Sequence, residues 1–270
     1  MENPNAVHIC SAQIAGVWED PDATLKKAGI FVRHAAASGA AMVCFPEQFA
    51  TGWDPCSGAH AEDTSGSTVS ILRELAKENN ISVLGSFRER TENLPKNTAI
   101  VIGSDGNILS EYAKIHLFSY GSEHKGFTPG SELGIFTLGP LTCGIAICYD
   151  LRFPELFRLY AKKGVQAVFV PAAWPAGRMK HWELFITVRA CENQIYVTGI
   201  NTTGRTPVDQ YVGGSMTADP HGAVISRANE AEQLLFCELD PEAVKAARTS
   251  FPVAKDCRDD LYQALSGKDY

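Results

Sequence analysis

The stretch that decides the fold class reads Thr142-Cys143-Gly144-Ile145-Ala146-Ile147-Cys148-Tyr149-Asp150. Its first six residues form a short apolar run, which predicts a buried β-strand. Pro154 stands at the start of the segment that follows and Gly164 just past its end, and this asymmetry is typical of a helix. A buried strand that leads through a short polar turn into a helix is the basic unit of an α/β protein.

The same alternation of strands and helices extends along the chain in both directions. Apolar runs and turn residues predict strands at 7–14, 41–45, 81–87, 98–103, 108–113, 142–147, 166–170, 195–200, 211–218, 223–227 and 234–239. Helical patterns cover 22–38, 69–78, 154–163 and 180–192. This order predicts helices that cover two sheets, and not a single Rossmann sheet. No repeat or linker interrupts residues 1–270, so we expect one domain.

The charge balance and the apolar runs limit the classes of partner. The chain has 31 acidic and 24 basic residues and a formal charge of −7, which argues against nucleic acid or an anionic membrane. No uncharged run reaches the length of about 18 residues that a membrane-spanning helix needs. The first five residues, Met-Glu-Asn-Pro-Asn, lack the basic and apolar regions of a signal peptide. We therefore expect a cytoplasmic protein.

The cysteines and histidines do not follow a metal-binding pattern. The 8 cysteines include no Cys-x-x-Cys pair, and the 7 histidines include no ligand pair four residues apart. Nucleotide-binding motifs such as the P-loop and G-x-G-x-x-G are also missing. We therefore expect no metal and no cofactor. Most of the cysteines are expected to be small buried side chains in a reducing compartment.

Three predicted strands end at residues that can perform chemistry. Glu47 follows the strand at 41–45, Lys114 follows the strand at 108–113, and Cys148 follows the strand at 142–147. Ligands bind at the carboxyl ends of strands in α/β sheets, so we expect the three side chains to meet there. A thiol just before a helix also has backbone N–H groups beside it. Taken alone, a cysteine in this position is more often simply buried.

Three sequence blocks carry a resemblance to a known family. They are Phe45-Pro46-Glu47, Tyr112-Ala113-Lys114-Ile115-His116-Leu117-Phe118, and the run from Gly144 to Glu155. In this order and spacing they resemble the signature blocks of the nitrilase superfamily of carbon–nitrogen hydrolases, and the resemblance covers about residues 6–262. It implies a four-layer αββα sandwich, which agrees with the predicted order of elements.

The residue types also suit the hydrolysis of an amide, which needs a nucleophile, a proton carrier and oxyanion stabilisation. Cys148 would attack the carbonyl carbon and form a thioester, and Glu47 would carry the proton. Lys114 and the backbone N–H of Tyr149 would stabilise the oxyanion. The resemblance adds Glu123 as a supporting residue, with a solvated loop residue as the alternative. Burial should raise the pKa of Glu47 and Lys114 should lower it, and the sequence leaves open which effect wins.

The segments around Trp174 and Asn201 resemble the omega-amidase branch of the superfamily, whose members cleave the side amide of 2-oxo-acid monoamides. Such a substrate carries a free carboxylate, for which Arg178 is the predicted partner, with a salt bridge on the rim as the alternative. Phe118, Tyr120 and Trp174 are predicted pocket walls, with core packing as the alternative. We expect a homodimer or larger homo-oligomer. The alternative functions are a carbamoylase, then a nitrilase or a catalytically quiet binding protein.

Overall fold

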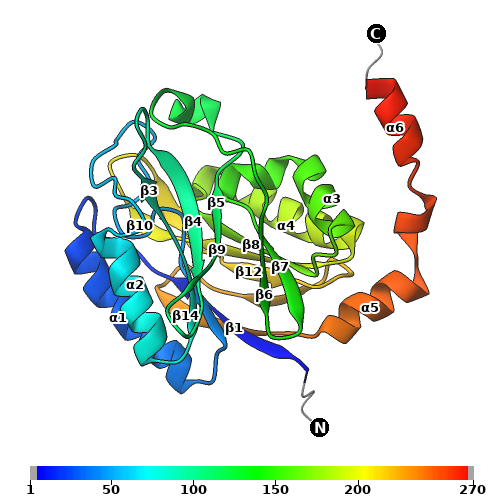
Figure 1. Cartoon of the computed structure of the whole chain (residues 1–270), viewed down its shortest axis with the longest axis horizontal. Helices are drawn as coiled ribbons and strands as arrows, with labels where there is room; N and C mark the ends of the chain where they lie inside the picture. Colours follow the sequence, from blue (N-terminus) through cyan, green and yellow to red (C-terminus); the bar gives the residue numbers. More distant parts are fainter. Residues whose placement is uncertain (1–4, 267–270) are drawn as a thin grey trace.

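Two six-stranded sheets pack face to face between helices in the computed structural model, which describes residues 5–266 (Figure 1). Their strand orders are β14-β1-β2-β3-β4-β5 and β13-β12-β9-β8-β7-β6. Each sheet has three parallel strands at its centre, β1-β2-β3 in one and β9-β8-β7 in the other, and antiparallel strands outside them. The four-layer sandwich predicted from the sequence is therefore confirmed.

The strands of the first sheet are β1 (Val7–Gln13), β2 (Met42–Cys44), β3 (Ser82–Glu89), β4 (Lys96–Ile102), β5 (Ile108–Ala113) and β14 (Gln233–Leu239). Those of the second are β6 (Gly134–Leu138), β7 (Leu141–Ile145), β8 (Ala167–Ala172), β9 (Tyr196–Asn201), β12 (Met216–Ala218) and β13 (Val224–Arg227). A separate pair consists of β10 (Thr203–Arg205) and β11 (Gln210–Val212).

Helices cover the outer face of each sheet. The first sheet packs against α1 (Pro21–Ala37) and α2 (Ser67–Glu78), and the second against α3 (Pro154–Lys162) and α4 (Met179–Asn193). The close fit of α4 on β9 requires Gly199, since a Cβ there would lie 2.5 Å from a ring carbon of Trp182. Trp182 and Ile186 of α4 fill this space and are buried.

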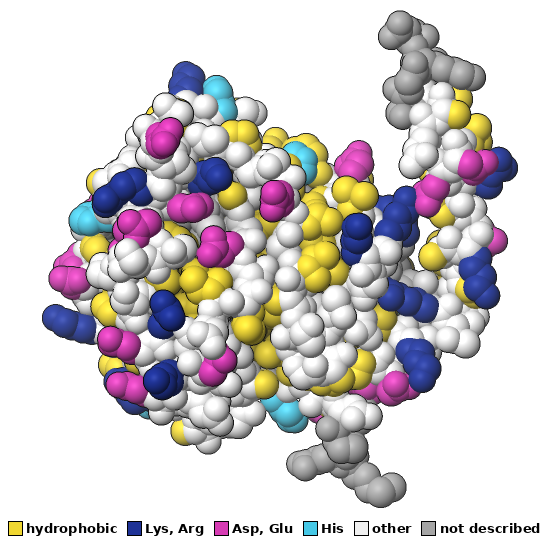
Figure 2. Space-filling model, viewed as in Figure 1, with side chains coloured by type: hydrophobic (Ala, Val, Ile, Leu, Met, Phe, Trp, Pro, Cys, Tyr) yellow, Lys and Arg dark blue, Asp and Glu magenta, His cyan; other side chains and the backbone are white. Residues whose placement is uncertain are grey.

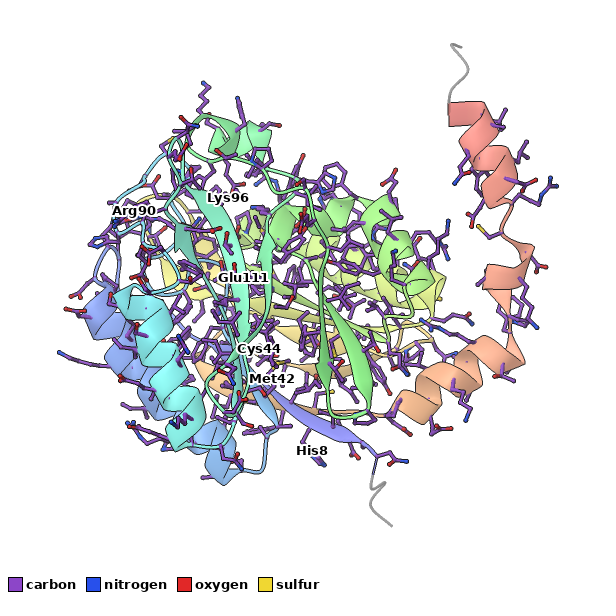
Figure 3. All side chains as sticks on the ribbon, in the orientation of Figure 1. His8, Met42, Cys44, Arg90, Lys96 and Glu111 are labelled. Atoms are coloured by element: carbon purple, nitrogen blue, oxygen red, sulfur yellow. The ribbon has the colours of Figure 1, made fainter. Side chains whose placement is uncertain are left out.

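The side chains of the strands alternate between two cores, as strand geometry requires. Met42 and Cys44 of β2, both labelled in Figure 3, point into the core between the two sheets. Val43, which lies between them, packs against the core under α1 and α2. Both faces of the central strands are therefore buried, and this explains their continuous apolar runs.

The structure corrects the predicted elements in several regions. The single strand predicted at 211–218 is wrong, because Gly213 (φ 63°) and Gly214 (φ 75°) take left-handed backbone and divide it into β11 and β12. The two pieces belong to different sheets. The sequence patterns also did not predict β6 or the helix α5 (Pro241–Ser250).

The C-terminal part of the chain extends away from the sandwich (Figure 1). This C-terminal arm (residues 241–266) consists of α5, a short 3-10 helix at Val253–Asp256 and α6 (Asp259–Ser266). It exposes large apolar side chains, among them Phe251 and Tyr262. Among residues 5–266, no helix is long and apolar enough to cross a membrane.

Candidate active site

The three predicted strand ends meet at one buried polar group. Glu47 follows β2 and Lys114 follows β5, and the Nζ of Lys114 lies 2.7 Å from Oε1 of Glu47. Lys114 and Cys148, which follows β7, line the same pocket. Glu123, on a 3-10 turn at Glu123–Lys125, joins them with its Oε2 at 2.8 Å from Lys114 Nζ. The structure thus brings together all four residues expected to support catalysis.

Glu47 is buried and accepts three hydrogen bonds. Its Oε1 accepts from Lys114 and, at 2.7 Å, from Nδ2 of Asn97, while Oε2 accepts from the backbone N–H of Ala173 at 3.0 Å. Burial raises the pKa of Glu47, Lys114 opposes this change, and the charge of Glu123 adds to it, with a net result above the usual range. Burial and the charge of Glu123 together therefore outweigh Lys114.

Glu123 has the opposite balance. It is fully buried, and it accepts from Lys114, from Asn97 at 3.1 Å, from the backbone N–H of Phe118 at 2.7 Å and from Trp53 Nε1 at 3.4 Å. Burial alone would raise the pKa of Glu123, but Lys114 and these donors outweigh it and leave the pKa below the usual range. The pKa values of the two carboxyl groups therefore shift in opposite directions, and Glu47 is the stronger base of the two.

Lys114 stays charged although it is buried. Burial favours the neutral amine, but the charges of Glu123 and Glu47 outweigh that effect and raise the pKa of Lys114 above its usual range. Its three Nζ–H donors are directed at the two carboxylates. An ammonium in this state can stabilise an oxyanion but cannot act as a base.

Cys148 lies in a strained turn that other residues hold in place. It begins the 3-10 helix at Cys148–Arg152 with a φ of 44°, which is unusual for a residue other than glycine. Asp150 fixes this turn, because its Oδ2 accepts from the N–H of Ile147 at 2.9 Å and from the hydroxyl of Tyr112 at 2.7 Å. The first N–H groups of a helix have no partner within the helix, so the N–H of Tyr149 is available to an oxyanion.

The Cys148 thiol needs a base to become a nucleophile. Burial raises the pKa of Cys148, the negative charge of Glu47 raises it further, and Lys114 only partly offsets these effects. The resting group is therefore a thiol beside a carboxylate with a raised pKa. This pairing suits a proton transfer between the two groups.

A small pocket with aromatic and charged walls opens onto Cys148. Its lining residues are Trp53, Lys114, Phe118, Cys148, Tyr149, Arg152, Ala173, Trp174, Pro175, Arg178, Asp209 and Tyr211. Phe118, Trp174 and Arg178 are thus in the predicted place. Tyr120 is not: its side chain is 82% exposed, and its ring lies outside the pocket, 5.2 Å from the guanidinium carbon of Arg178.

Two arginines face this pocket, and only Arg178 was predicted. Arg178 lies over the ring of Phe118 at 5.5 Å, and Arg152 lies over the ring of Trp174 at 5.1 Å. Burial lowers the pKa of Arg152, and the charge of Arg178 contributes to the lowering, as expected for neighbouring cations. In the described part of the chain, the arginine–carboxylate ion pairs are formed by other residues: Arg88, Arg189, Arg227 and Arg258.

Sequence reasoning missed Asn97, Trp53, Arg152 and Asp150 as parts of the site. A polar residue at the start of an apolar strand was a signal for Asn97, and Arg152 and Asp150 lay inside the quoted Cys148 block. Nothing in the sequence pattern marked Trp53. No group of three or more His, Cys, Asp or Glu within the described residues could hold a metal ion.

A two-sheet α/β sandwich in which a buried carboxylate and ammonium lie beside a thiol defines the nitrilase class of hydrolase. The carbon-nitrogen hydrolase family model matches residues 8–249, and the chain belongs to this family. It is a hydrolase that acts on carbon–nitrogen bonds other than peptide bonds.

Similar proteins support the same branch that the sequence predicted. The chain is 35% identical over 244 residues to the 2-oxoglutaramate amidase of Bacillus subtilis (strain 168), covering 90% of this chain and 94% of the relative. It is 34% identical over 279 residues to omega-amidase NIT2 of Mus musculus, covering 96% and 97%. The crystal structure of XC1258 from Xanthomonas campestris, a CN-hydrolase superfamily protein with an arsenic adduct in its active site, has a TM-score of 0.89 at 27% identity and covers 94% and 98%.

Proposed function

We propose that this protein is an omega-amidase, which cleaves the side amide of dicarboxylate or 2-oxo-acid monoamides such as 2-oxoglutaramate and releases ammonia. The observation that carries the proposal is the pocket: Cys148, Arg152 and Arg178 all line it, and neither arginine forms an ion pair with a carboxylate among residues 5–266. The names of the two relatives, 2-oxoglutaramate amidase and omega-amidase, support the same substrate class.

The first half of the proposed reaction forms a thioester. Glu47 takes the proton of the Cys148 thiol as Sγ attacks the amide carbon. The resulting oxyanion receives hydrogen bonds from Lys114 and from the N–H of Tyr149. Protonation neutralises Glu47 and weakens its hold on Lys114, so an Nζ–H becomes available when the oxyanion forms. Glu47 then gives the proton to the departing nitrogen, and ammonia leaves.

The second half releases the acid. A water molecule enters the place of ammonia, and Glu47 takes its proton as the oxygen attacks the thioester. The second tetrahedral intermediate collapses, the carbon–sulfur bond breaks, and Cys148 recovers a proton from Glu47. Because Lys114 and Glu123 keep their charges throughout, Glu47 is the single proton carrier in both halves.

Recognition of the distant carboxylate is assigned to the two arginines. A carboxylate loses water when it enters a pocket lined by Trp53, Phe118 and Trp174, and only charged, oriented donors offset that cost. Arg178 presents its planar guanidinium from the 3-10 turn at Ala176–Arg178, whose end is tied to Trp174 by a hydrogen bond of 2.9 Å. Arg152 provides a second cation from the turn that holds Cys148.

The test is ammonia release from succinamate and 2-oxoglutaramate by the wild-type protein and two cysteine variants. Cys148→Ala should abolish release, whereas Cys191→Ala, which changes an exposed cysteine on α4, should retain it. Substantial release by Cys148→Ala would refute the thioester mechanism. Absence of release from either substrate by the wild-type protein would refute the assigned substrate class.

The arginine pair would also suit the carboxylate of an N-carbamoyl amino acid, so a carbamoylase is the second candidate. That reaction releases carbon dioxide together with ammonia, whereas an amidase releases ammonia alone. Measurement of both gases from N-carbamoyl amino acids separates the two functions. A nitrilase or a catalytically quiet binding member has no comparable support.

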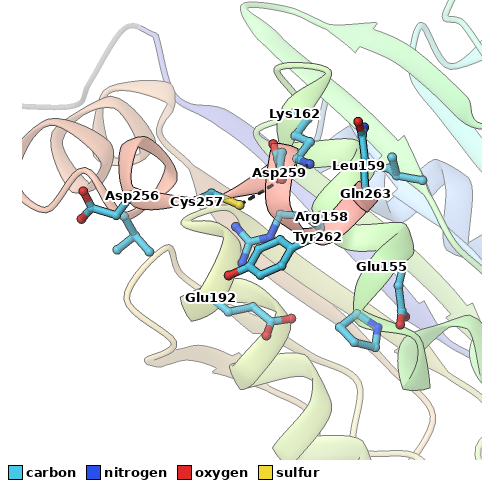
Figure 4. Close-up of a pocket in the computed structure, with 12 residues that line it drawn as sticks. Glu155, Arg158, Leu159, Lys162, Glu192, Asp256, Cys257, Asp259, Tyr262 and Gln263 are labelled. Carbon is cyan, nitrogen blue, oxygen red and sulfur yellow. Dashed lines mark hydrogen bonds and ion pairs between the residues drawn. The ribbon is translucent and has the colours of Figure 1, made fainter. Parts of the chain in front are cut away.

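We also propose that the protein is a homodimer or a larger homo-oligomer, with the C-terminal arm at the interface. Figure 4 shows the groove between α3 and the arm, where Lys162 contacts Asp259 at 2.6 Å and Leu159 and Tyr262 also line the walls. Lys and Arg side chains gather on the side of the body that faces the arm (Figure 2). A second copy would cover the exposed apolar side chains of the arm. Sedimentation of the full chain and of Tyr262→Asp tests this, and a monomeric wild type would refute it.

We further propose that residues 1–270 act as one carbon–nitrogen hydrolase domain in the cytoplasm. The family match over residues 8–249 supports the single domain. The absence of stabilising disulfides supports a reducing compartment, because all 8 cysteines are free. Limited proteolysis and cell fractionation test the two statements separately.

A further inference from the structure

Asn97 stands at the centre of the buried polar group although it carries no charge. It is the second residue of β4, directly after the Lys96 labelled in Figure 3, and it is fully buried. Its Nδ2 donates to Oε1 of Glu47 at 2.7 Å and to Oε1 of Glu123 at 3.1 Å. A single amide therefore uses both of its hydrogens on the two carboxylates of the site.

The orientation of this amide is fixed by a closed ring of hydrogen bonds. The hydroxyl of Ser86 donates to Oδ1 of Asn97 at 3.1 Å, and the hydroxyl oxygen of Ser86 accepts from the backbone N–H of Gln48 at 3.1 Å. Gln48 directly follows Glu47, so the ring returns to the carboxylate where it began. In the flipped orientation the amide oxygen of Asn97 would face the two carboxylates. An amide oxygen and a carboxylate are both acceptors, so no hydrogen bond could form between them.

Asn97 makes the two oxygens of Glu47 unequal. Oε1 accepts from both Lys114 and Asn97, whereas Oε2 accepts from the N–H of Ala173, and the Cys148 thiol also lies within hydrogen-bond reach of this carboxylate. Each carboxylate oxygen has about two acceptor sites. Oε1 is therefore saturated, and Oε2 keeps an acceptor site for the proton of the Cys148 thiol.

We propose that Asn97 is a positioning residue whose amide saturates Oε1 of Glu47, ties that carboxylate to Glu123, and so assigns the proton-accepting role to Oε2 of Glu47. The inference rests on the proposed mechanism, in which Glu47 takes the thiol proton. It adds that Lys114 and Asn97 have different roles: Lys114 supplies a positive charge, and Asn97 fixes the orientation of the Glu47 carboxylate.

A neutral donor suits this position better than a second cation would. The titratable groups that face Glu47 are Lys114 after β5, Glu123 on its 3-10 turn, Cys148 after β7 and Tyr211 on β11. Another positive charge would stabilise the ionised carboxylate strongly and make Glu47 a weak base. An amide holds the carboxylate in place and leaves the site with one excess negative charge.

The experiment measures how alkylation of Cys148 by iodoacetamide depends on pH, together with the pH dependence of kcat/KM for succinamate. Asn97→Leu removes both N–H donors of the amide and keeps a side chain of similar size. Asn97→Asp replaces the amide with a third carboxyl group. Loss of donors to the ionised form raises the pKa of Glu47, so the acid limb of both curves should move up by about 1 pH unit in Asn97→Leu. The shift should be larger in Asn97→Asp because of the added like charge.

Two further variants separate this role from general stability. Ser86→Ala leaves Asn97 in place but frees its amide to rotate, and it should shift the limb in the same direction by a smaller amount. Ser86→Ala also carries the test if Asn97→Leu does not fold. The matched control is Asn193→Leu, since Asn193 is a buried asparagine of α4 whose Nδ2 donates to the carbonyl of Arg189 and to the carboxylate of Glu192, and not to Glu47 or Glu123. This control should leave the limb unchanged.

Unshifted curves in folded Asn97 variants and in Ser86→Ala would overturn the proposal, as would an equal shift in Asn193→Leu. The alkylation curve needs no amide substrate. Absence of amide turnover by the wild-type protein would therefore count against the proposed function, while the alkylation curves would still decide the role of Asn97.

Discussion

Removal of the Arg178 guanidinium should separate charged from uncharged substrates. Arg178 has no carboxylate partner in the described part of the chain, and it lies at the pocket wall over Phe118. In Arg178→Ala the substrate carboxylate would still contact Arg152 but would lose its contact with the Arg178 guanidinium. Binding of succinamate should therefore weaken, whereas butyramide, which lacks a carboxylate, should bind almost as before.

The size of the effect follows from the geometry of the pocket. A hydrogen bond to a charged group contributes about 1.5–3 kcal/mol, and solvent near the partly exposed Arg178 reduces this toward the lower value. A loss of about 1.4 kcal/mol raises KM about tenfold. We expect at least this change for succinamate and 2-oxoglutaramate. Arg178→Lys should recover only part of it, because an ammonium lacks the paired donors of the guanidinium.

The assay is ammonia release over a range of concentrations of succinamate and butyramide. Lys180→Ala is the matched control, since it removes one positive charge nearby from an exposed position that does not line the pocket. Equal losses on both amides in Arg178→Ala would show that Arg178 supports the fold, and the carboxylate would then need another partner. An unchanged KM for succinamate would refute the clamp itself.

The remaining predictions concern the catalytic residues. Cys148→Ala should abolish turnover and leave the melting temperature within a few degrees of the wild type, as differential scanning calorimetry can check. Glu47→Gln should lower kcat about 10²–10⁴-fold, which is the usual contribution of a general acid–base group; a mild effect would demote Glu47 to a structural role. In the wild type, kcat/KM should fall as pH drops through the raised pKa of Glu47, since the protonated carboxyl cannot take the thiol proton. Lys114→Met should lose about 2.7–4 kcal/mol of transition-state stabilisation, measured as kcat/KM. Because two buried carboxylates then lose their counter-ion, circular dichroism must first show that this variant has a native fold.

The positions of these residues at strand ends were predictable from strand direction, whereas the meeting of Cys148 with Glu47 and Lys114 also depends on the packing of the two sheets. Glu47, Lys114 and Cys148 each come directly after an apolar run, and the carboxyl ends of parallel strands share an edge. Asn97 was not predictable in the same way, since it stands at the beginning of β4, which runs in the opposite direction to its neighbours β3 and β5. Only the antiparallel pairing brings the start of one strand beside the ends of others.

Side-chain direction was the second limit on prediction. Phe118 and Tyr120 are two residues apart on one loop, and the sequence offers no reason to treat them differently. The 3-10 turn at Ser119–Gly121 directs Phe118 into the pocket and leaves Tyr120 exposed outside it. Backbone direction was equally hard to predict at Gly213-Gly214. The left-handed backbone of this pair divides an apparently continuous strand between two sheets.

The polar group at the site is divided between the two sheets. Asn97 lies in the first sheet, and Glu47 and Lys114 follow two of its strands. Cys148 and Ala173 follow strands of the second sheet. Apolar packing between the sheets sets the distance between Glu47, the base, and Cys148, the nucleophile. The turnover rate therefore depends on how the two sheets are aligned. A displacement of 1 Å at reacting atoms costs about 10²-fold in rate. Pressure or mild heat can shift one sheet relative to the other. Such a shift should abolish activity although every strand and helix remains intact.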